Sequence, residues 1–242
     1  MLKKCNAIVI GTLNYSENSV ILKCFTDLHG LQSYLINGVK GNKAAIRPSQ
    51  LMPLTLLELE VYHQHNKNLH RIKELKCTPV LSGLHFDMVK SAIGMFIAEL
   101  TGKCLRNENE EDRNLFNYLF NAIQILDVTN ESLANFPVFF MIQLSKYLGF
   151  YPKMNYSAQA NSFSLYEGIF IPYNPAKPDV CNPTLSFILF ELIGARFETF
   201  SQIRISHADR MILLDRMIRY FKLHLMVFGE LNSPKILNVV MA

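Results

Sequence analysis

The stretch Ser19-Val20-Ile21-Leu22-Lys23-Cys24-Phe25 decides the fold of the first third of the chain. Its β-branched and apolar side chains predict a strand. Similar short runs lie around it, at residues 7–12, 31–36, 54–61 and 69–75. Segments rich in Gly, Asn, Asp and Ser separate them and favour turns. Five short strands in this space predict a small closed barrel of the OB type. The strand count alone does not distinguish it from an SH3-like barrel.

Beyond residue 80 the apolar residues recur every three or four positions, which predicts helices with one buried face. Acidic residues at 109–112 favour a helix start, where negative charge meets the positive end of the helix dipole. The segment 150–182 carries four prolines and two runs that can pair as a hairpin, 163–166 and 168–171. The expected helices cover residues 84–105, 135–149, 183–197 and 206–228. One more is expected to start within 109–112 and to end at 126.

We therefore predict an α+β protein of two domains. The first, over residues 1–80, is an OB-fold barrel that binds nucleic acid, and the second, over 81–242, is helical with the insert 150–182. Residues 1–80 hold ten Lys and Arg against five Asp and Glu, whereas residues 81–242 hold fourteen against fifteen. Because phosphate backbones attract clustered cations, the excess of basic residues favours the barrel as the DNA-binding part.

The composition excludes several classes of protein. The chain has 242 residues, 50% of them hydrophobic and 18% charged, which excludes a disordered polymer. Its apolar runs fall short of the ~18 residues that a membrane span needs, so we expect a soluble protein. The N-terminus lacks the features of a secretory signal, which predicts a cytoplasmic protein. The DNA binding expected of the barrel would place it at the nucleoid. The five cysteines are scattered without a C-x-x-C motif, which argues against disulfides and a cysteine zinc site.

No motif in the sequence supports catalysis. The chain has no phosphate-binding loop, dinucleotide fingerprint, H-E-x-x-H or G-x-S-x-G motif, so we expect no cofactor, no catalytic residue and no enzyme. The acidic residues at 108–112 fit a helix start better than a metal site. His63, His65 and His70 form the only histidine cluster, and we interpret them as a solvated strand end.

The candidate DNA-binding residues are cations of the predicted barrel. They are Lys23, Lys40, Lys43, Arg47 and Arg71. Lys40 and Lys43 lie in a glycine-bearing loop that would let several cations converge on phosphates. Exposed aromatic residues on a barrel face can stack on unpaired bases, and the candidates are Tyr15, Phe25, Tyr34 and Tyr62. The plain alternative is a solubilising lysine face with aromatic residues in the core.

Motifs along the whole chain resemble those of the RecO family of bacterial recombination mediators. In the first third these are Ala7-Ile8-Val9-Ile10, Tyr15-Ser16-Glu17-Asn18-Ser19, Phe25-Thr26-x-x-x-Gly30, Gly38-x-Lys40 and Leu51-x-Pro53. Later matches are Phe96-x-x-Glu99-Leu100, Gly149-Phe150-x-Pro152, Tyr220-x-x-x-His224-Leu225 and Leu231-Asn232-Ser233.

The resemblance implies an OB-fold barrel, a helical domain and a function without hydrolytic chemistry. It implies binding of single- and double-stranded DNA, annealing of complementary strands and help in loading RecA onto DNA coated by single-strand binding protein (SSB). The implied partners are RecR and the acidic C-terminal tail of SSB. The family insert often holds a four-cysteine zinc ribbon.

Two departures from the family pattern carry predictions. The four zinc-ligand positions hold Ser157, Ala160, Pro172 and Pro175, so we predict no structural zinc. We expect apolar packing to hold the insert instead, through Phe163, Tyr166, Ile169 and Phe170. The arginines expected near the start of the third helix, for the SSB tail, are replaced by Val138 and Phe139.

A second hypothesis is a protein-binding adaptor that contacts no membrane and binds DNA only incidentally. Its helical groove would receive an acidic peptide tail between the basic residues Lys103, Arg106 and Lys146. A barrel with a purely structural helical bundle would explain the composition equally well.

Overall fold

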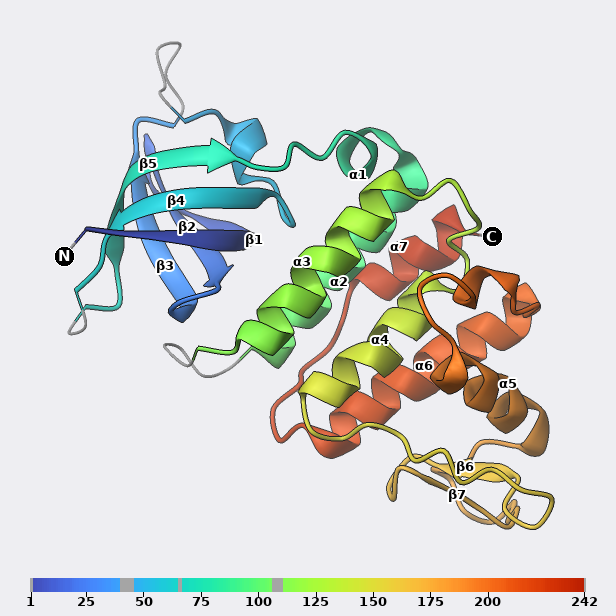
Figure 1. Ribbon diagram of the computed structural model, residues 1–242. Coiled ribbons are helices and arrows are strands. Elements are labelled where there is room, and N and C mark those ends of the chain that lie inside the picture. Colours follow the sequence, from blue (N-terminus) through green and yellow to red (C-terminus); the bar gives the residue numbers. More distant parts are fainter. Residues whose placement is uncertain (1, 40–45, 65–66, 106–110, 242) are drawn as a thin grey trace. The chain divides into compact units, whose positions relative to one another are not determined.

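The first part of the chain is a closed five-stranded β-barrel (Figure 1). The structure is a computed structural model that describes residues 2–39, 46–64, 67–105 and 111–241. Neighbouring strands are antiparallel except β3 and β5, which are parallel, and the order is β1-β2-β3-β5-β4. The prediction of an OB-fold-like barrel followed by helices is confirmed. The strands are β1 (Leu2–Ser16), β2 (Ser19–Thr26), β3 (Gly30–Asn37), β4 (Leu56–Tyr62) and β5 (His70–Cys77).

Strand β1 closes the barrel and is longer than its predicted range of 7–12. Its first half pairs with β4, from Leu2 opposite Tyr62 to Ile8 opposite Leu56, and its second half pairs with β2. A register shift between Val9 and Gly11 lies near the change of partner, where a bulge lets a strand bend. The barrel core is formed by inward side chains of all five strands, among them Leu22, Cys24, Tyr34, Leu57, Leu59 and Ile72.

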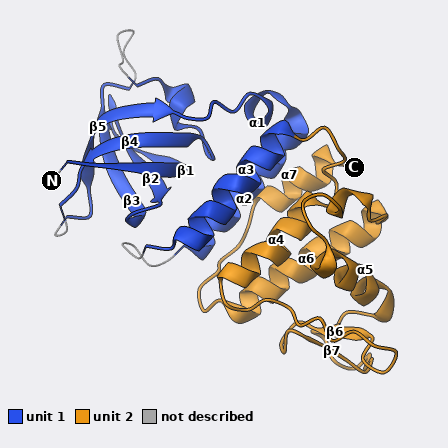
Figure 2. Cartoon of the chain, in the orientation of Figure 1, with its two compact units in different colours: residues 1–128 blue, residues 129–242 orange. Residues whose placement is uncertain are grey.

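Three helices pack in the same compact unit as the barrel (Figure 2). They are α1 (Gly83–Phe86), α2 (Met88–Cys104) and α3 (Arg113–Val128), with a short 3-10 turn η1 (Pro48–Leu51) before β4. The rings of Phe25 in the barrel and Phe116 in α3 lie 6.0 Å apart. A Cβ atom on Gly102 of α2 would lie only 3.0 Å from the Ile10 side chain, so glycine allows this close approach between helix and strand.

The predicted single helix over 84–105 is two helices. Asp87 has extended backbone geometry, and its carboxylate accepts a hydrogen bond from the Lys90 backbone N–H at 2.9 Å. This is the geometry of a helix N-cap, so α2 starts after Asp87. Asp112 likewise accepts from the Leu115 N–H at 2.9 Å at the start of α3, where acidic residues were predicted to open a helix.

The chain divides into two compact units, residues 1–128 and 129–242. The barrel strands end at Cys77, close to the predicted domain boundary at residue 80, but α1, α2 and α3 belong to the barrel's unit. The division into domains at 80 and 81 stays a prediction from the sequence. Within the described residues no helix is both long enough and apolar enough to span a lipid bilayer.

The second unit is a helical bundle with a small hairpin (Figure 2). Asn135 and Pro137 stand at the start of α4 and Asn182 and Pro183 at the start of α5, as the sequence predicts. Both α5 and α6 end earlier than predicted, and α7 was not predicted. The elements are α4 (Phe136–Tyr147), β6 (Ser162–Ser164), β7 (Ile169–Ile171), α5 (Pro183–Gly194), η2 (Phe200–Gln202), α6 (His207–His224) and α7 (Ser233–Val240).

The insert is closed by main-chain hydrogen bonds and aromatic packing. Ser157 and Ala160, at two of the family's ligand positions, bond to each other through their backbones. Phe163 and Phe170 are buried and their rings lie 5.1 Å apart. The expectation for Tyr166 is wrong, because its side chain is 73% exposed at the tip of the hairpin. Ser157, Ala160, Pro172 and Pro175 carry no thiolate, imidazole or carboxylate, so these positions do not fit the zinc of a ribbon.

Candidate nucleic-acid interface

Two of the predicted cations, Lys23 and Arg71, lie on one outer face of the barrel. Lys23 of β2 is paired with Ser33 of β3, and Arg71 of β5 is paired with Leu35 of β3. Ser33 and Leu35 are two residues apart, so they point to the same side of β3. Tyr34, which lies between Ser33 and Leu35, points into the core instead, as does Leu22 of β2, with which it is paired. We call the outer surface made by Lys23, Ser33, Leu35, Ile21 and Arg71 the β2-β3-β5 face.

The β2-β3-β5 face holds cations without carboxylates. Lys23 is half-buried and Arg71 is exposed. Among the described residues of the first 80, Lys73 is the one Lys or Arg in an ion pair, with Glu60 at 3.1 Å. The positive charge of Lys23 and Arg71 is therefore not neutralised by an internal partner, which leaves it available to phosphates.

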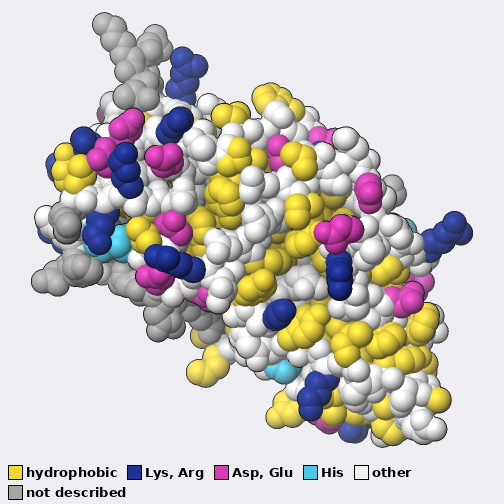
Figure 3. All heavy atoms as spheres, viewed as in Figure 1, with side chains coloured by type: hydrophobic (Ala, Val, Ile, Leu, Met, Phe, Trp, Pro, Cys, Tyr) yellow, Lys and Arg dark blue, Asp and Glu magenta, His cyan; other side chains and the backbone are white. Residues whose placement is uncertain are grey.

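The outer surface of the barrel over β1, β4 and β5, which we call the β1-β4-β5 face, has a different charge pattern. Its outward side chains alternate in sign across the strands, with Lys4 opposite Glu60 and Glu58 opposite Lys76. Figure 3 shows basic and acidic side chains side by side over the barrel strands in view. Carboxylates at this density repel a phosphate backbone, so the part of this face around Glu58 and Glu60 is not a candidate for DNA.

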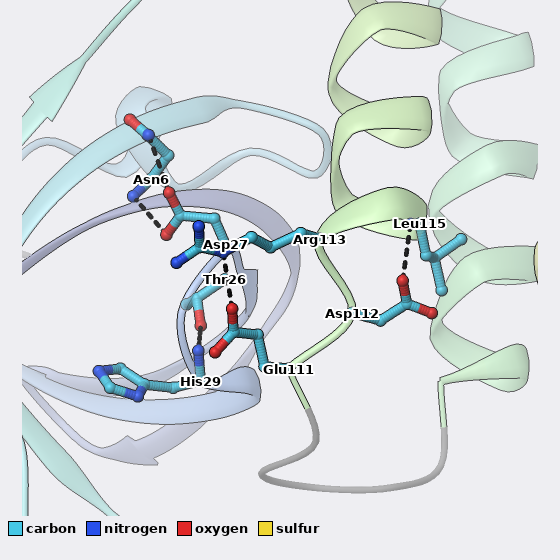
Figure 4. Close-up of polar contacts among 8 residues, drawn as sticks. All are labelled: Asn6, Thr26, Asp27, His29, Glu111, Asp112, Arg113 and Leu115. Atoms are coloured by element: carbon cyan, nitrogen blue, oxygen red, sulfur yellow. Dashed lines mark hydrogen bonds and ion pairs between the residues drawn. The ribbon is translucent and has the colours of Figure 1, made fainter.

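The turn between β2 and β3 is also acidic and is fixed by its own hydrogen bonds (Figure 4). The Asp27 carboxylate accepts from the backbone and side-chain N–H groups of Asn6, both at 3.0 Å. The Thr26 hydroxyl accepts from the His29 N–H at 3.0 Å. Figure 4 shows the Arg113 side chain extending from the start of α3 towards this turn, where Arg113 also pairs with Glu111 at 2.6 Å. Phe25, just before this turn, packs against Phe116 of α3, so this end of the barrel contacts a helix of its own unit.

Of the three remaining predicted cations, the structure describes Arg47. Arg47 is exposed directly before η1, and its backbone N–H donates to the Gln50 side chain at 2.8 Å. Leu51, at the end of η1, is part of the barrel core, which anchors this segment. Lys40 and Lys43 lie outside the described residues. The roles of all five cations in DNA binding stay predictions.

The four aromatic candidates for base stacking divide into two pairs. Phe25 is 2% exposed and Tyr34 is fully buried, so the interpretation of these two as stacking residues is wrong. Tyr34 points into the barrel core together with Leu22, which is paired with it, whereas Phe25 lies on the outer side of β2 and is buried against Phe116 of α3. Tyr15 and Tyr62 are 61% and 50% exposed, and their rings are available to a ligand.

The histidines are not a solvated strand end. His63 and His70 are buried, and their rings stack at 4.6 Å. His29, which lies far from them in the sequence and was not grouped with them, stacks on His63 at 3.9 Å with the rings nearly parallel. Burial and the nearby charge of Lys67 lower the pKa of His70. His65 lies outside the described residues. Within those residues no group of three or more His, Cys, Asp or Glu side chains has metal-binding geometry.

Four of the five cysteines are buried, and Cys77 is half-buried. Burial raises the pKa of Cys5 to about 12 and of Cys181 to about 11, and it raises the pKa of Cys24 further still. All five cysteines are free, and a thiol with a raised pKa is protonated and unreactive at neutral pH.

The candidates for binding an acidic peptide belong to different parts of the chain. Lys103 is half-buried in α2 of the first unit, Lys146 is exposed on α4 of the second unit, and Arg106 lies outside the described residues. Val138 and Phe139, which replace the family's arginines, are each 1% exposed and belong to the core of the second unit. A peptide site at these positions stays a prediction.

Comparisons with known proteins agree with the barrel and the helical region. Residues 1–80 match the family model "Recombination protein O N terminal", and residues 85–228 match "Recombination protein O C terminal". Similar curated proteins named "DNA repair protein RecO" come from Azobacteroides pseudotrichonymphae, Flavobacterium psychrophilum and Bacteroides fragilis. Each is 32% identical to this chain, over 99%, 98% and 98% of both chains respectively. The chain therefore belongs to the RecO family of DNA repair and recombination proteins.

Proposed function

We propose that this chain is a recombination mediator that binds single- and double-stranded DNA through the β2-β3-β5 face of its barrel. Lys23, Arg71 and Arg47 would contact phosphates, joined by Lys40 and Lys43. The observation that carries the proposal is the pair Lys23 and Arg71 on one outer face, without a carboxylate beside them. Such contacts release counterions from DNA and do not depend on its sequence.

Annealing of complementary strands follows from this surface without covalent chemistry. A cationic face neutralises the repulsion between two phosphate backbones and raises the local concentration of one strand near the other. Base pairing then supplies the free energy. We further propose that the chain acts with RecR to help load RecA onto DNA coated by SSB, whose acidic tail it binds. Family membership supports these partners.

The mediator function is tested by an annealing assay with complementary strands that are first coated with the cognate SSB. We expect the wild-type chain to accelerate annealing of the coated strands. The variant with Lys23→Ala and Arg71→Ala should lose most of this acceleration. Lys73→Ala is the matched control, because Lys73 is already paired with Glu60. Equal rates with and without the wild-type chain would refute the mediator function.

The adaptor hypothesis predicts different relative affinities for an acidic peptide and for DNA. If peptide binding were primary, an acidic peptide with an apolar end would bind tightly while DNA bound weakly. Lys146→Glu would then abolish peptide binding, because it reverses an exposed charge on α4. Titration of the wild-type chain with the peptide and with DNA separates the two hypotheses.

A further inference from the structure

A hollow lies at the end of the barrel where β4 ends and β5 begins. Its volume is about 390 Å³, within the range typical of sites for small ligands. None of its described lining residues is acidic, and two are basic. They are Tyr62, Gln64, Lys67, Leu69, His70 and Arg71. No residue of this hollow except Arg71 belongs to the β2-β3-β5 face.

Tyr62 offers an aromatic surface at this hollow. It is the last residue of β4, and its side chain is 50% exposed. It is paired with Leu2 of β1 on one side and with Arg71 of β5 on the other, so these three side chains form a row on the outside of the barrel. An aromatic ring held by a strand pairing and open to solvent is a platform on which an unpaired base can stack.

Arg71 and Lys67 supply positive charge beside that ring. Both are exposed, and neither makes an ion pair within the described part of the chain. Side chains directly opposite each other on paired strands have Cβ atoms about 5 Å apart. The Arg71 guanidinium is therefore within reach of the phosphate of a nucleotide whose base lies on Tyr62. Its planar fork suits two oxygens of one phosphate.

Stacked imidazoles lie beneath the hollow. His70 lines it and is 3% exposed, and its ring stacks on His63, which stacks in turn on His29. His70 also packs near Tyr34 of β3, with ring centroids 6.0 Å apart. This packing ties the ends of β4 and β5 to β3 and to the β2-β3 turn. The hollow is thus formed before a ligand binds, which lowers the ordering cost of binding.

We propose that this hollow binds one unpaired nucleotide of single-stranded DNA, with its base stacked on Tyr62 and its phosphate held by Arg71 and Lys67. The inference rests on the proposed function, since Arg71 is shared with the β2-β3-β5 face. It adds selectivity to that face, because the bases of a duplex are already stacked on each other. The phosphate contacts alone would bind duplex and single strand alike, whereas Tyr62 favours the single strand.

The chain contains no tryptophan, so a single introduced tryptophan reports on its own surroundings. In the full-length variant Tyr62→Trp, titration with a poly-thymidine strand should quench the tryptophan fluorescence, because the indole stacks on bases. Tyr166→Trp is the control, since Tyr166 is exposed on the insert hairpin of the second unit. Its fluorescence should stay unchanged in the same titration.

Affinity measurements with labelled DNA complete the test. Tyr62→Ala should weaken binding of single strands by about 5- to 150-fold, the range that corresponds to removal of one stacked base. Tyr62→Phe should bind normally, and the affinity of all variants for duplex should not change. If DNA binds but Tyr62→Trp is not quenched, or Tyr62→Ala loses affinity for single strands and duplex equally, the nucleotide site is refuted and the proposed function stands. If the wild-type chain binds no DNA, both fail.

Discussion

Ser157 and Ala160 exchange two backbone hydrogen bonds, from the Ser157 N–H to the Ala160 carbonyl at 3.1 Å and from the Ala160 N–H to the Ser157 carbonyl at 3.2 Å. The Ser157 hydroxyl also accepts from the Ala160 N–H at 3.1 Å. The family resemblance predicts zinc-ligand cysteines at these two positions, where this chain has Ser157 and Ala160. A turn closed by its own main chain needs no metal to hold it.

The first prediction concerns this zinc-free insert. A strong chelator should leave the melting temperature unchanged, because no zinc–thiolate bond contributes to the free energy of unfolding. Metal analysis of the purified protein should find no zinc in proportion to the chain. One zinc per chain, or a melting temperature several degrees lower with chelator, would contradict the prediction.

The second prediction concerns the side chain that holds β7. The Asn155 amide donates to the Phe170 carbonyl at 2.8 Å and accepts from the Phe170 N–H at 2.9 Å, as a neighbouring strand would. Asn155→Ala should lower the free energy of unfolding by about 1–3 kcal/mol, because it leaves both groups without their partner. Gln159→Ala, at an exposed position of the same insert, should have almost no effect in the same urea titration. Equal stability of the two variants would show that Asn155 does not hold β7.

The third prediction is a decrease in stability at mildly acidic pH. Because burial lowers the pKa of His70 in the folded state, the unfolded chain binds a proton first as the pH falls below about 6.5. The contribution of neutral His70 to the free energy of unfolding is therefore fully present above this pH. It decreases below this pH, until His70 is protonated in the folded state as well. His85, whose pKa burial also lowers, contributes in the same direction.

Urea midpoints measured between neutral pH and mildly acidic pH test this behaviour. His70→Gln should make the midpoint less sensitive to pH than that of the wild-type chain. A midpoint that rises on acidification would have the wrong sign for a histidine buried in its neutral form.

The fourth prediction concerns the packing of α1 against the end of α3. A Cβ atom on Gly83 would lie 2.2 Å from the Asp127 carbonyl oxygen, which accepts a hydrogen bond from the Lys90 side chain at 2.6 Å. Gly83→Ala should destabilise the protein by about 1–3 kcal/mol, because backbone must move to relieve the overlap. Gly11→Ala is the control, as its Cβ would meet no atom within 4 Å. A thermal melt that shows equal effects would refute this packing.

The sequence predicts the barrel and most helices because these depend on local patterns. Alternating side chains in residues 19–25 and 31–36 predict strands, and Asn135 with Pro137 predicts a helix start. Each of these patterns depends only on the residues of its own segment. The break at Asp87 is not predicted because the apolar spacing continues through it. Only the hydrogen bond from the Lys90 N–H reveals the cap.

The candidate site is less predictable, because it depends on which strands become neighbours. The parallel pairing of β3 with β5 brings Arg71 beside Leu35, and no local pattern indicates it. The same pairing buries His70, whereas its polar side chain alone predicts a position in solvent. Exposure of Tyr62 and burial of Phe25 likewise depend on tertiary neighbours, because Phe25 packs against Phe116 of α3 whereas Tyr62 stays open to solvent at the end of β4.

The central claim is that Lys23 and Arg71 bind phosphates from one face of the barrel, and the salt dependence of DNA affinity tests it most directly. The affinity of the wild-type chain for single-stranded DNA should fall steeply as salt rises. In the double variant Lys23→Ala, Arg71→Ala the slope should be shallower by about 0.7 for each phosphate that is no longer neutralised, with Lys73→Ala unchanged. A double variant whose affinity and slope equal those of the wild-type chain would contradict the account.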